Sequence, residues 1–271
     1  MIAPTEEISS TKEPSASITQ ESTISAENYV WKSLGPDGGN IYSLAIDPIT
    51  PTTLYVATGG GVFKTTNGGD EWSAVNTGLS ILNVISLVID PLIPDVIYAA
   101  TRDVFFKSTN GGANWSLASS GFKAFDNTIS TLVIDPITPT TLYAGLIGSR
   151  GGVLKSIDGG ETWVKTRLIN TEVSIIVIDP TTPSTLYAEA DGWLVKSTNG
   201  GEQWNRANIG LPEPPYNGVI SLAINPMKPE ILYAGTRNHG LYTSTNAGGN
   251  WTKSNTGLDV DDVTYMVINP I

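Results

Sequence analysis

The sequence contains no cysteine and a single histidine, His239. Disulfide frameworks, thiolate zinc sites and cysteine nucleophiles are therefore excluded, because each needs at least one thiol. A multi-histidine metal site is excluded as well. No motif in the chain indicates a cofactor or a metal, and we expect neither.

Positive charge is also scarce. The chain has 15 Lys and Arg against 26 Asp and Glu, which gives a formal net charge of −11, and it has no basic run. Binding of polyanions depends on Lys and Arg, so we expect no nucleic-acid partner. No apolar run reaches the length that spans a bilayer, and Glu6 and Glu7 replace the basic start of a signal peptide. We expect no membrane insertion and see no signal peptide.

Residues 1–28 have almost nothing with which to build a core. They hold ten Ser or Thr, five Glu and no aromatic residue. Such a composition buries too little apolar surface to offset the entropy of ordering. We predict a disordered Ser/Thr/Glu-rich linker. Leaders of this kind often tether exported domains, which favours an extracytoplasmic or secreted location.

What the chain does have is an internal repeat from residue 29 to residue 271. One series of residues marks it with tryptophan: Trp31, Trp72, Trp115, Trp163, Trp204 and Trp251. A second series precedes a proline each time: Asp47, Asp90, Asp135, Asp179, Asn225 and Asn269. Both series share one period of roughly 45 residues, which is typical of a repeat protein.

Each repeat reads as four strands. The first is nearly all apolar (ISLVID) and must end at its Asp-Pro, because proline cannot donate to a ladder. TLYVAT-like and GVFKTT-like strands follow, and the fourth begins at the tryptophan. With 28 Gly, 17 Pro and no helical period, the fold class is all-β. We predict a β-propeller of four-stranded antiparallel blades with the apolar strand innermost.

The two ends of the repeat region supply unmatched strands. An outer strand surrounds Trp31, and an inner strand, VTYMVIN, ends at Asn269. We therefore expect five complete blades and a partial sixth, in a propeller truncated at its C-terminus.

The turn between the third and fourth strands reads TTNGGDEW, STNGGANW, SIDGGETW, STNGGEQW and STNAGGNW. Its Asn or Asp can accept bonds from nearby backbone N–H groups, while the glycines supply positive φ. Because the turn recurs in every blade, we predict that it is structural. Its residues are Asn67, Trp72, Asn110, Trp115, Asp158, Trp163, Asn199, Trp204, Asn246 and Trp251. The recurring lysines before it are predicted to be blade-surface charges: Lys64, Lys107, Lys155 and Lys196.

These turns resemble the Asp-box of the BNR repeat family, although four of the five copies have Asn where that family usually has Asp. The resemblance covers residues 29–271 and implies a β-propeller. Within the family it points in two directions. Sortilin-type receptor domains and the photosystem II assembly factor family bind partners, whereas sialidases and xyloglucanases are glycoside hydrolases.

Loops at one end of the predicted strands vary in length and composition between repeats, so a binding site is expected there. The candidate ligand-binding residues are Arg102, Asp103, Arg150, Asp191, Trp193, Arg237 and His239. Trp193 lies outside the tryptophan series. It is a candidate stacking platform for a sugar or peptide, and blade packing is the alternative.

No residue is assigned to catalysis. The Arg-Ile-Pro motif of sialidases is absent, and xyloglucanase-like enzymes need paired acids, for which Asp103 is the one candidate. We therefore predict a non-catalytic scaffold or binding module with a protein or carbohydrate partner. The alternative is a fragment of a glycoside hydrolase, xyloglucanase-like or sialidase-like.

Overall fold

The computed structural model describes residues 35–36, 39–118, 127–213, 218–259 and 261–268. The chain divides into two units, Met1–Ser33 and Leu34–Ile271, and all described residues belong to the second. The expected linker, the strand around Trp31 and Asn269 lie outside the described residues.

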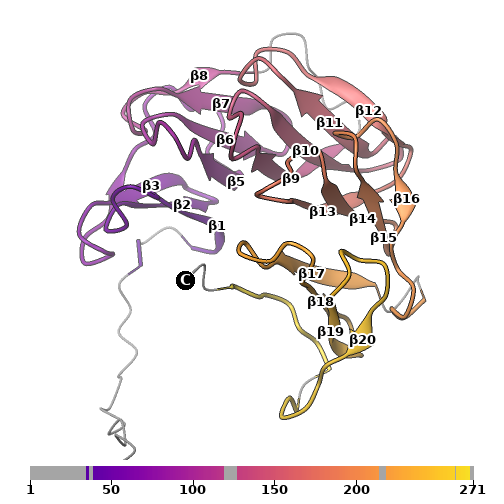
Figure 1. The fold of residues 1–271 in the computed structure, drawn as a ribbon. Coiled ribbons are helices and arrows are strands. Elements are labelled where there is room, and N and C mark those ends of the chain that lie inside the picture. Colours follow the sequence, from indigo (N-terminus) through magenta and orange to yellow (C-terminus); the bar gives the residue numbers. More distant parts are fainter. Residues whose placement is uncertain (1–34, 37–38, 119–126, 214–217, 260, 269–271) are drawn as a thin grey trace, which may run out of the picture. The chain divides into compact units, whose positions relative to one another are not determined.

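Five four-stranded antiparallel sheets, called blades 1 to 5, follow one another in chain order (Figure 1). The first strands are β1 (Ile41–Ile46), β5 (Val84–Ile89), β9 (Thr128–Ile134), β13 (Val173–Ile178) and β17 (Val219–Ile224). The second strands are β2 (Leu54–Thr58), β6 (Ile97–Thr101), β10 (Leu142–Ile147), β14 (Leu186–Ala190) and β18 (Leu232–Thr236). The third strands are β3 (Gly61–Thr65), β7 (Phe105–Ser108), β11 (Gly152–Ser156), β15 (Trp193–Ser197) and β19 (Gly240–Ser244).

The fourth strands are short except in blade 3: β4 (Ser73–Ala74), β8 (Ser116–Leu117), β12 (Val164–Ile169), β16 (Asn205–Arg206) and β20 (Thr252–Lys253). First strands of consecutive blades contact one another, so they are innermost as predicted. The described residues contain no helix. The prediction of an all-β propeller with five complete four-stranded blades is confirmed.

Each inner strand ends where the Asp-Pro mark predicts, and the carboxylate itself closes the turn. Asp90 Oδ1 accepts the N–H groups of Leu92 at 2.9 Å and of Ile93 at 3.0 Å. This turn recurs at the other four marks that the structure describes, including Asn225, whose amide oxygen accepts in the same way. The turn fixes where the second strand of the blade begins.

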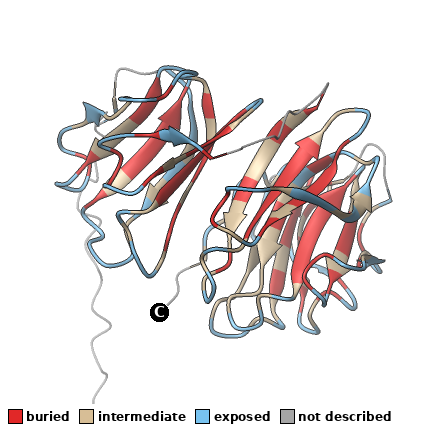
Figure 2. Ribbon diagram, turned by 90° about the horizontal axis from the view of Figure 1, so that it is seen from above, coloured by how far each residue is buried: buried red, intermediate tan, exposed pale blue. Residues whose placement is uncertain are grey.

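The core consists of four apolar clusters, one between each pair of consecutive blades. Between blades 1 and 2, for example, Leu87 is 4% exposed and packs with Tyr55 and Phe106. Buried residues follow the strands, and exposed residues gather in the turns (Figure 2). Burial of these faces is the main stabilisation of the fold, because no blade buries its own two faces alone.

The prediction that the recurring lysines are blade-surface charges is wrong. Each ammonium donates to a backbone carbonyl in the turn of the next blade and lies 5.1–5.4 Å from the ring of a tyrosine in its own blade. A charge that recurs in four of the five repeats can serve the contact between repeats, which the sequence of one repeat does not reveal. The pairs are Lys64–Gly111, Lys107–Gly159, Lys155–Gly200 and Lys196–Ala247, with N···O distances of 3.1, 3.3, 3.1 and 2.9 Å.

The Asp-box turns are held by their Asn or Asp. Asn110 Oδ1 accepts the Ser108 hydroxyl at 3.0 Å and the Asn114 N–H at 2.9 Å, and Asp158 makes the same bonds with Ser156 and Thr162. One carbonyl-type oxygen is enough for this role. Asn therefore preserves the turn in the four repeats that lack Asp.

In blades 2, 3 and 5 the tryptophan of the turn also bonds to the preceding blade, whereas Trp204 of blade 4 donates to Gly201 O in its own turn. Trp115 Nε1 donates to Val75 O at 2.7 Å, and Trp251 Nε1 donates to Ala207 O at 2.7 Å. In blade 1, which has no preceding blade among the described residues, Trp72 Nε1 is buried without a partner. In blades 2, 3 and 5, tryptophan and lysine therefore both hold the turn to the preceding blade.

The expected sixth inner strand is not formed over its described part, residues 263–268. Its first residue lies along blade 5, where Val263 N–H donates to Thr236 O at 3.3 Å and Val263 O accepts the Ser221 hydroxyl at 2.6 Å. A strand needs a ladder partner, and no described residue supplies the second strand of a sixth blade.

Candidate functional site

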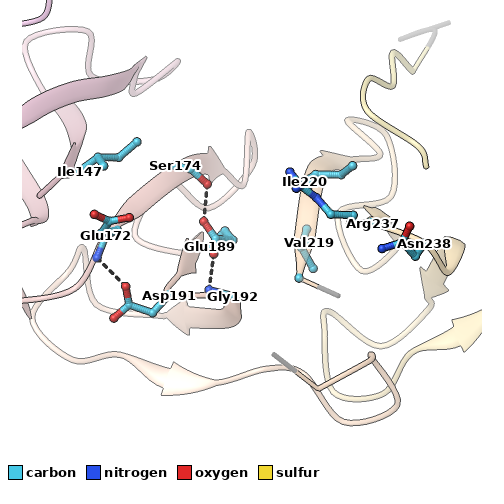
Figure 3. Close-up of a pocket in the computed structure, with 11 residues that line it drawn as sticks. Ile147, Glu172, Ser174, Glu189, Asp191, Gly192, Val219, Ile220, Arg237 and Asn238 are labelled. Carbon is cyan, nitrogen blue, oxygen red and sulfur yellow. Dashed lines mark hydrogen bonds between the residues drawn. The ribbon is translucent and has the colours of Figure 1, made fainter. Parts of the chain in front are cut away.

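An open pocket of about 660 Å³ lies between blades 4 and 5, at the end where the loops vary (Figure 3). Blade 4 supplies Glu172, Ser174, Glu189, Asp191 and Gly192. Blade 5 supplies Gly218, Val219, Ile220, Arg237 and Asn238, and Ile147 completes the lining from β10. The pocket therefore has an acidic wall and a facing wall with one arginine.

Glu189 is the buried charge of this pocket, with 8% of its surface exposed. Its Oε1 accepts the Gly192 N–H at 2.5 Å, and its Oε2 accepts the hydroxyl of Ser174. Burial raises the pKa of the Glu189 carboxyl above its ordinary value, and these bonds offset part of that rise. The carboxyl is held in one place, and it still lines the pocket.

Ser174 reaches Glu189 because the inner strand has a bulge at this point. The register of β13 against β14 shifts between Val173 and Ile175, so that Ser174 is the extra residue. A bulge re-aims a side chain locally. Corresponding bulges occur at the start of the other inner strands, so the bulge is a feature of the repeat and is not specific to this site.

Asp191 and Gly192 form the two-residue loop between β14 and β15, with φ of 49° and 86°. An Asp-Gly pair with two positive φ values is typical of a tight hairpin turn. The Asp191 carboxylate points toward the loop before β13, where it accepts the Glu172 N–H at 2.9 Å and the Thr171 hydroxyl at 2.7 Å. It therefore fastens two loops of the acidic wall together.

On the facing wall, the guanidinium of Arg237 is exposed and makes no hydrogen bond or ion pair with any described residue. Val219 and Ile220 give this wall an apolar base (Figure 3). Among its described residues, this wall thus offers one cation without a protein partner, beside an apolar surface.

Two of the seven candidate residues, Asp191 and Arg237, line this pocket. The other five do not. Arg102 and Asp103 are exposed in the loop between β6 and β7, and Arg150 is exposed between β10 and β11. His239 Nδ1 lies 3.1 Å from the backbone oxygen of Arg237, beside the pocket.

Trp193 packs within its blade. It borders the apolar cluster between blades 3 and 4, and the Arg206 guanidinium lies 3.6 Å from the centre of its ring. A cation already stacks on one face of the indole. Of the two interpretations of Trp193, this geometry favours packing.

The sequence analysis missed Glu189, although the repeats carry the signal. At this position of the second strand the other blades have Ala57, Ala100, Gly145 and Gly235, each paired with the inner strand in the same register. A glutamate at a position reserved for small residues is the departure that marks the site.

The chemistry available to the pocket is limited by where its acids lie. All three carboxylates belong to the blade 4 wall, and the facing wall has none among the described lining residues. Two acids that flank a glycosidic bond must lie on opposite sides of it. Nor do any three His, Asp or Glu side chains in the described part of the chain gather as a metal site would require.

Fold and turns together define a β-propeller of the BNR repeat type. The sequence profile of one family, described as photosynthesis system II assembly factor YCF48, matches residues 118–258, more than half of the chain. The chain belongs to this family. No curated protein sequence is significantly similar to it.

Solved structures share the fold. An ancestral GH74 enzyme superposes with a TM-score of 0.71 at 24% identity, over 86% of this chain and 33% of the enzyme. The GH74 xyloglucanase from Xanthomonas campestris gives 0.68 at 20% identity, over 78% and 38%. YCF48 bound to D1 peptide gives 0.61 at 17% identity, over 82% and 68%.

The chain thus spans only 33% and 38% of the lengths of the two GH74 structures. No described residue belongs to a helix long and apolar enough to cross a membrane.

Proposed function

We propose that this protein is a non-catalytic binding module that holds a segment of a partner protein in the pocket between blades 4 and 5. The observation that carries the proposal is the pocket itself. It lies at the variable end of the blades and combines a fixed carboxyl, an apolar base and a guanidinium that has no partner among the described residues. Such a mixture of few polar groups with apolar surface is typical of recognition sites.

A polypeptide fits this lining better than a sugar does. None of the described lining residues is aromatic, so the pocket offers no flat face on which a pyranose ring could stack. Trp193, the candidate platform, lies outside the lining and is covered by Arg206. A relative of the same fold, YCF48, has been seen with a D1 peptide bound, which is compatible with peptide recognition here.

Binding is also favoured over hydrolysis. A glycoside hydrolase would need a second acid facing Glu189, and Arg237 is the ionisable residue that the described part of the facing wall provides. Asp191 is engaged with the Glu172 N–H and the Thr171 hydroxyl. The acids of this wall therefore serve to shape the site and to attract a ligand.

Two arrays test the proposal. The full chain is applied to a peptide array and to a glycan array. In addition, xyloglucan is incubated with a high concentration of the protein. We expect retention on peptides and no release of reducing sugar. Binding to glycans and not to peptides, or hydrolysis of xyloglucan, would overturn the proposal.

Two variants test whether the pocket is the binding site. Arg237→Ala should reduce peptide retention, whereas Arg102→Ala, on a loop that does not line the pocket, should not.

A further inference from the structure

The buried position of Glu189 needs an explanation, because burying a carboxylate lowers the stability of the fold unless other interactions compensate for it. Four of the five blades place Ala or Gly at this point of the second strand. The fold therefore does not need the carboxyl. Blade 4 carries it in addition to what the blade requires.

One structural use of Glu189 can be separated from its use in binding. In blades 1 and 2 the next residue is a threonine whose hydroxyl accepts an N–H of the loop that follows, at 3.0 Å for Gly60 on Thr58 and 3.4 Å for Asp103 on Thr101. Blade 4 has Ala190 there, and Glu189 Oε1 accepts the Gly192 N–H instead. Capping the loop accounts for one oxygen of Glu189, but a threonine would do it without a buried charge.

The Glu189 carboxylate keeps hydrogen-bonding capacity beyond the cap of the loop. Each carboxylate oxygen can accept about two hydrogen bonds. The Gly192 N–H donates to Oε1, the Ser174 hydroxyl donates to Oε2, and the Ser174 backbone N–H also bonds to this carboxylate. Three donors leave capacity for about one more from the pocket. A fixed acceptor with this spare capacity at the wall of a pocket is suited to a ligand that brings an N–H donor.

The charge of the pocket selects the kind of donor. The lining contains three acids, Glu172, Glu189 and Asp191, and one base, Arg237. An ammonium or guanidinium would be attracted to the acidic wall, and the charge-assisted bond it forms there is stronger than a neutral one. An anionic group could pair with Arg237 but would also face the three carboxylates, so the pocket as a whole favours a cation.

We propose that the pocket receives the cationic side chain of a lysine or arginine from the partner polypeptide, with the Glu189 carboxylate as its anchor. This rests on the proposed function and names the chemical class of the ligand. Ser174 and Gly192 are positioning groups that hold the carboxyl, and Val219 and Ile220 accept the aliphatic stem of the side chain.

The blades themselves supply the matched variant. Glu189→Ala together with Ala190→Thr rebuilds the Ala-Thr pair of blades 1 and 2, Ala57-Thr58 and Ala100-Thr101, so the loop is capped without the carboxylate. This double variant should fold with an unchanged or higher melting temperature. It isolates the ligand role from the capping role, which Glu189→Gln or Glu189→Ala alone would not do.

The probes are three blocked tripeptides: acetyl-Ala-Lys-Ala-amide, its arginine analogue and its norleucine analogue. Full-length protein labelled with ¹³C in the glutamate carboxyls is titrated and followed by NMR. We expect the Glu189 resonance to move with the lysine and arginine peptides and not with norleucine. Affinity for the lysine peptide should fall by about tenfold or more in the double variant, as for loss of one charge-assisted bond. Glu172→Gln, an exposed acid of the same wall, should weaken it by less than about threefold.

Equal binding of lysine and norleucine peptides, or unchanged lysine affinity in the double variant, would overturn the inference. The peptide array separates this failure from that of the proposed function. If the array peptides are retained with no preference for lysine or arginine, the inference is wrong and the proposed function stands. If the wild-type chain retains no peptide on the array, the proposed function is wrong. The inference is then tested by the titration alone, through the shift of the Glu189 resonance with the lysine peptide.

Discussion

The Lys155 ammonium of blade 3 lies 3.1 Å from the carbonyl oxygen of Gly200, at the Asp-box turn of blade 4, and 5.4 Å from the centre of the Tyr143 ring. Tyr143 Oη donates to the same carbonyl at 3.3 Å. Burial raises the pKa of Tyr143 to about 12, so the phenol remains a donor throughout the physiological range. Two donors from one blade thus converge on one acceptor of the next.

Replacing Lys155 with Met should destabilise the propeller. Met keeps the aliphatic stem but removes the donor and the cation over the ring, so we expect a loss of about 1 to 2 kcal/mol in the free energy of unfolding. Chemical denaturation followed by tryptophan fluorescence measures it. Lys253→Met, at an exposed lysine without such a contact, is the control and should change stability by less than about 0.5 kcal/mol. Equal effects of both variants would contradict the role given to the contact.

Ala247 occupies the place that glycine takes in the other turns, with a φ of 55°. A residue with a Cβ is strained in this region, and glycine is not. We expect Ala247→Gly to raise the free energy of unfolding by about 0.5 to 1 kcal/mol, after allowing for the greater entropy of glycine in the unfolded chain.

The reverse change should do the opposite. A Cβ at Gly200, where φ is 68°, would lie 3.0 Å from Lys155 Nζ and 3.3 Å from Tyr143 Oη. Gly200→Ala should therefore lower stability by more than Ala247→Gly raises it. Both variants are measured in the same denaturation experiment, and a stabilising Gly200→Ala would refute the strain argument.

The repeat made most of the fold predictable. Proline ends the inner strands, the tryptophan begins the outer ones, and both recur in register, so strand order and blade number followed from spacing alone. Contacts between blades did not follow. Lys155 and Gly200 lie 45 residues apart, and one repeat read by itself shows a lysine on a strand and a glycine in a turn.

The site was harder to predict because its residues are ordinary in type. Arg237 and Asp191 stood out as charged residues in variable loops, and both line the pocket. Glu189 lies inside a strand, where a charged residue suggests a solvated face, and only its burial to 8% exposure shows otherwise. Ser174 becomes relevant through a bulge, which depends on the pairing of two strands.

Glu189 should make the protein more stable as the pH falls from neutral. Because burial raises its pKa, the folded state holds the proton more tightly than the unfolded state does, and ionisation above the raised pKa destabilises the fold. This penalty is relieved as the pH drops through the raised pKa toward the ordinary value of 4.5. Melting temperatures across this range, in wild type and in the Glu189→Ala, Ala190→Thr variant, check the sign. A variant with the same pH slope as wild type would contradict it.

Asp158 should give the stability of the fold the opposite dependence on pH, in a more acidic range. Bonds from the side chain and backbone of Thr162, with a further bond from Ser156, lower its pKa to about 2. Stability from the ionised carboxylate is present above the ordinary pKa of 3.8 and is lost as the pH falls toward 2. Asp158→Asn, which copies the other four turns, should flatten the acid limb of the stability curve between these values. An unaltered acid limb would show that the turn does not depend on this charge.

The central claim is that the variable end of blades 4 and 5 binds the partner while the Asp-box turns serve the scaffold. Hydrogen–deuterium exchange of the full chain, with and without a peptide retained on the array, tests it most directly. The account predicts slower exchange in residues 189–193, 218–220 and 237–238 when the peptide is bound, with the turns at 158–163 and 199–204 unchanged. Protection of those turns, with none at residues 189–193, would contradict it.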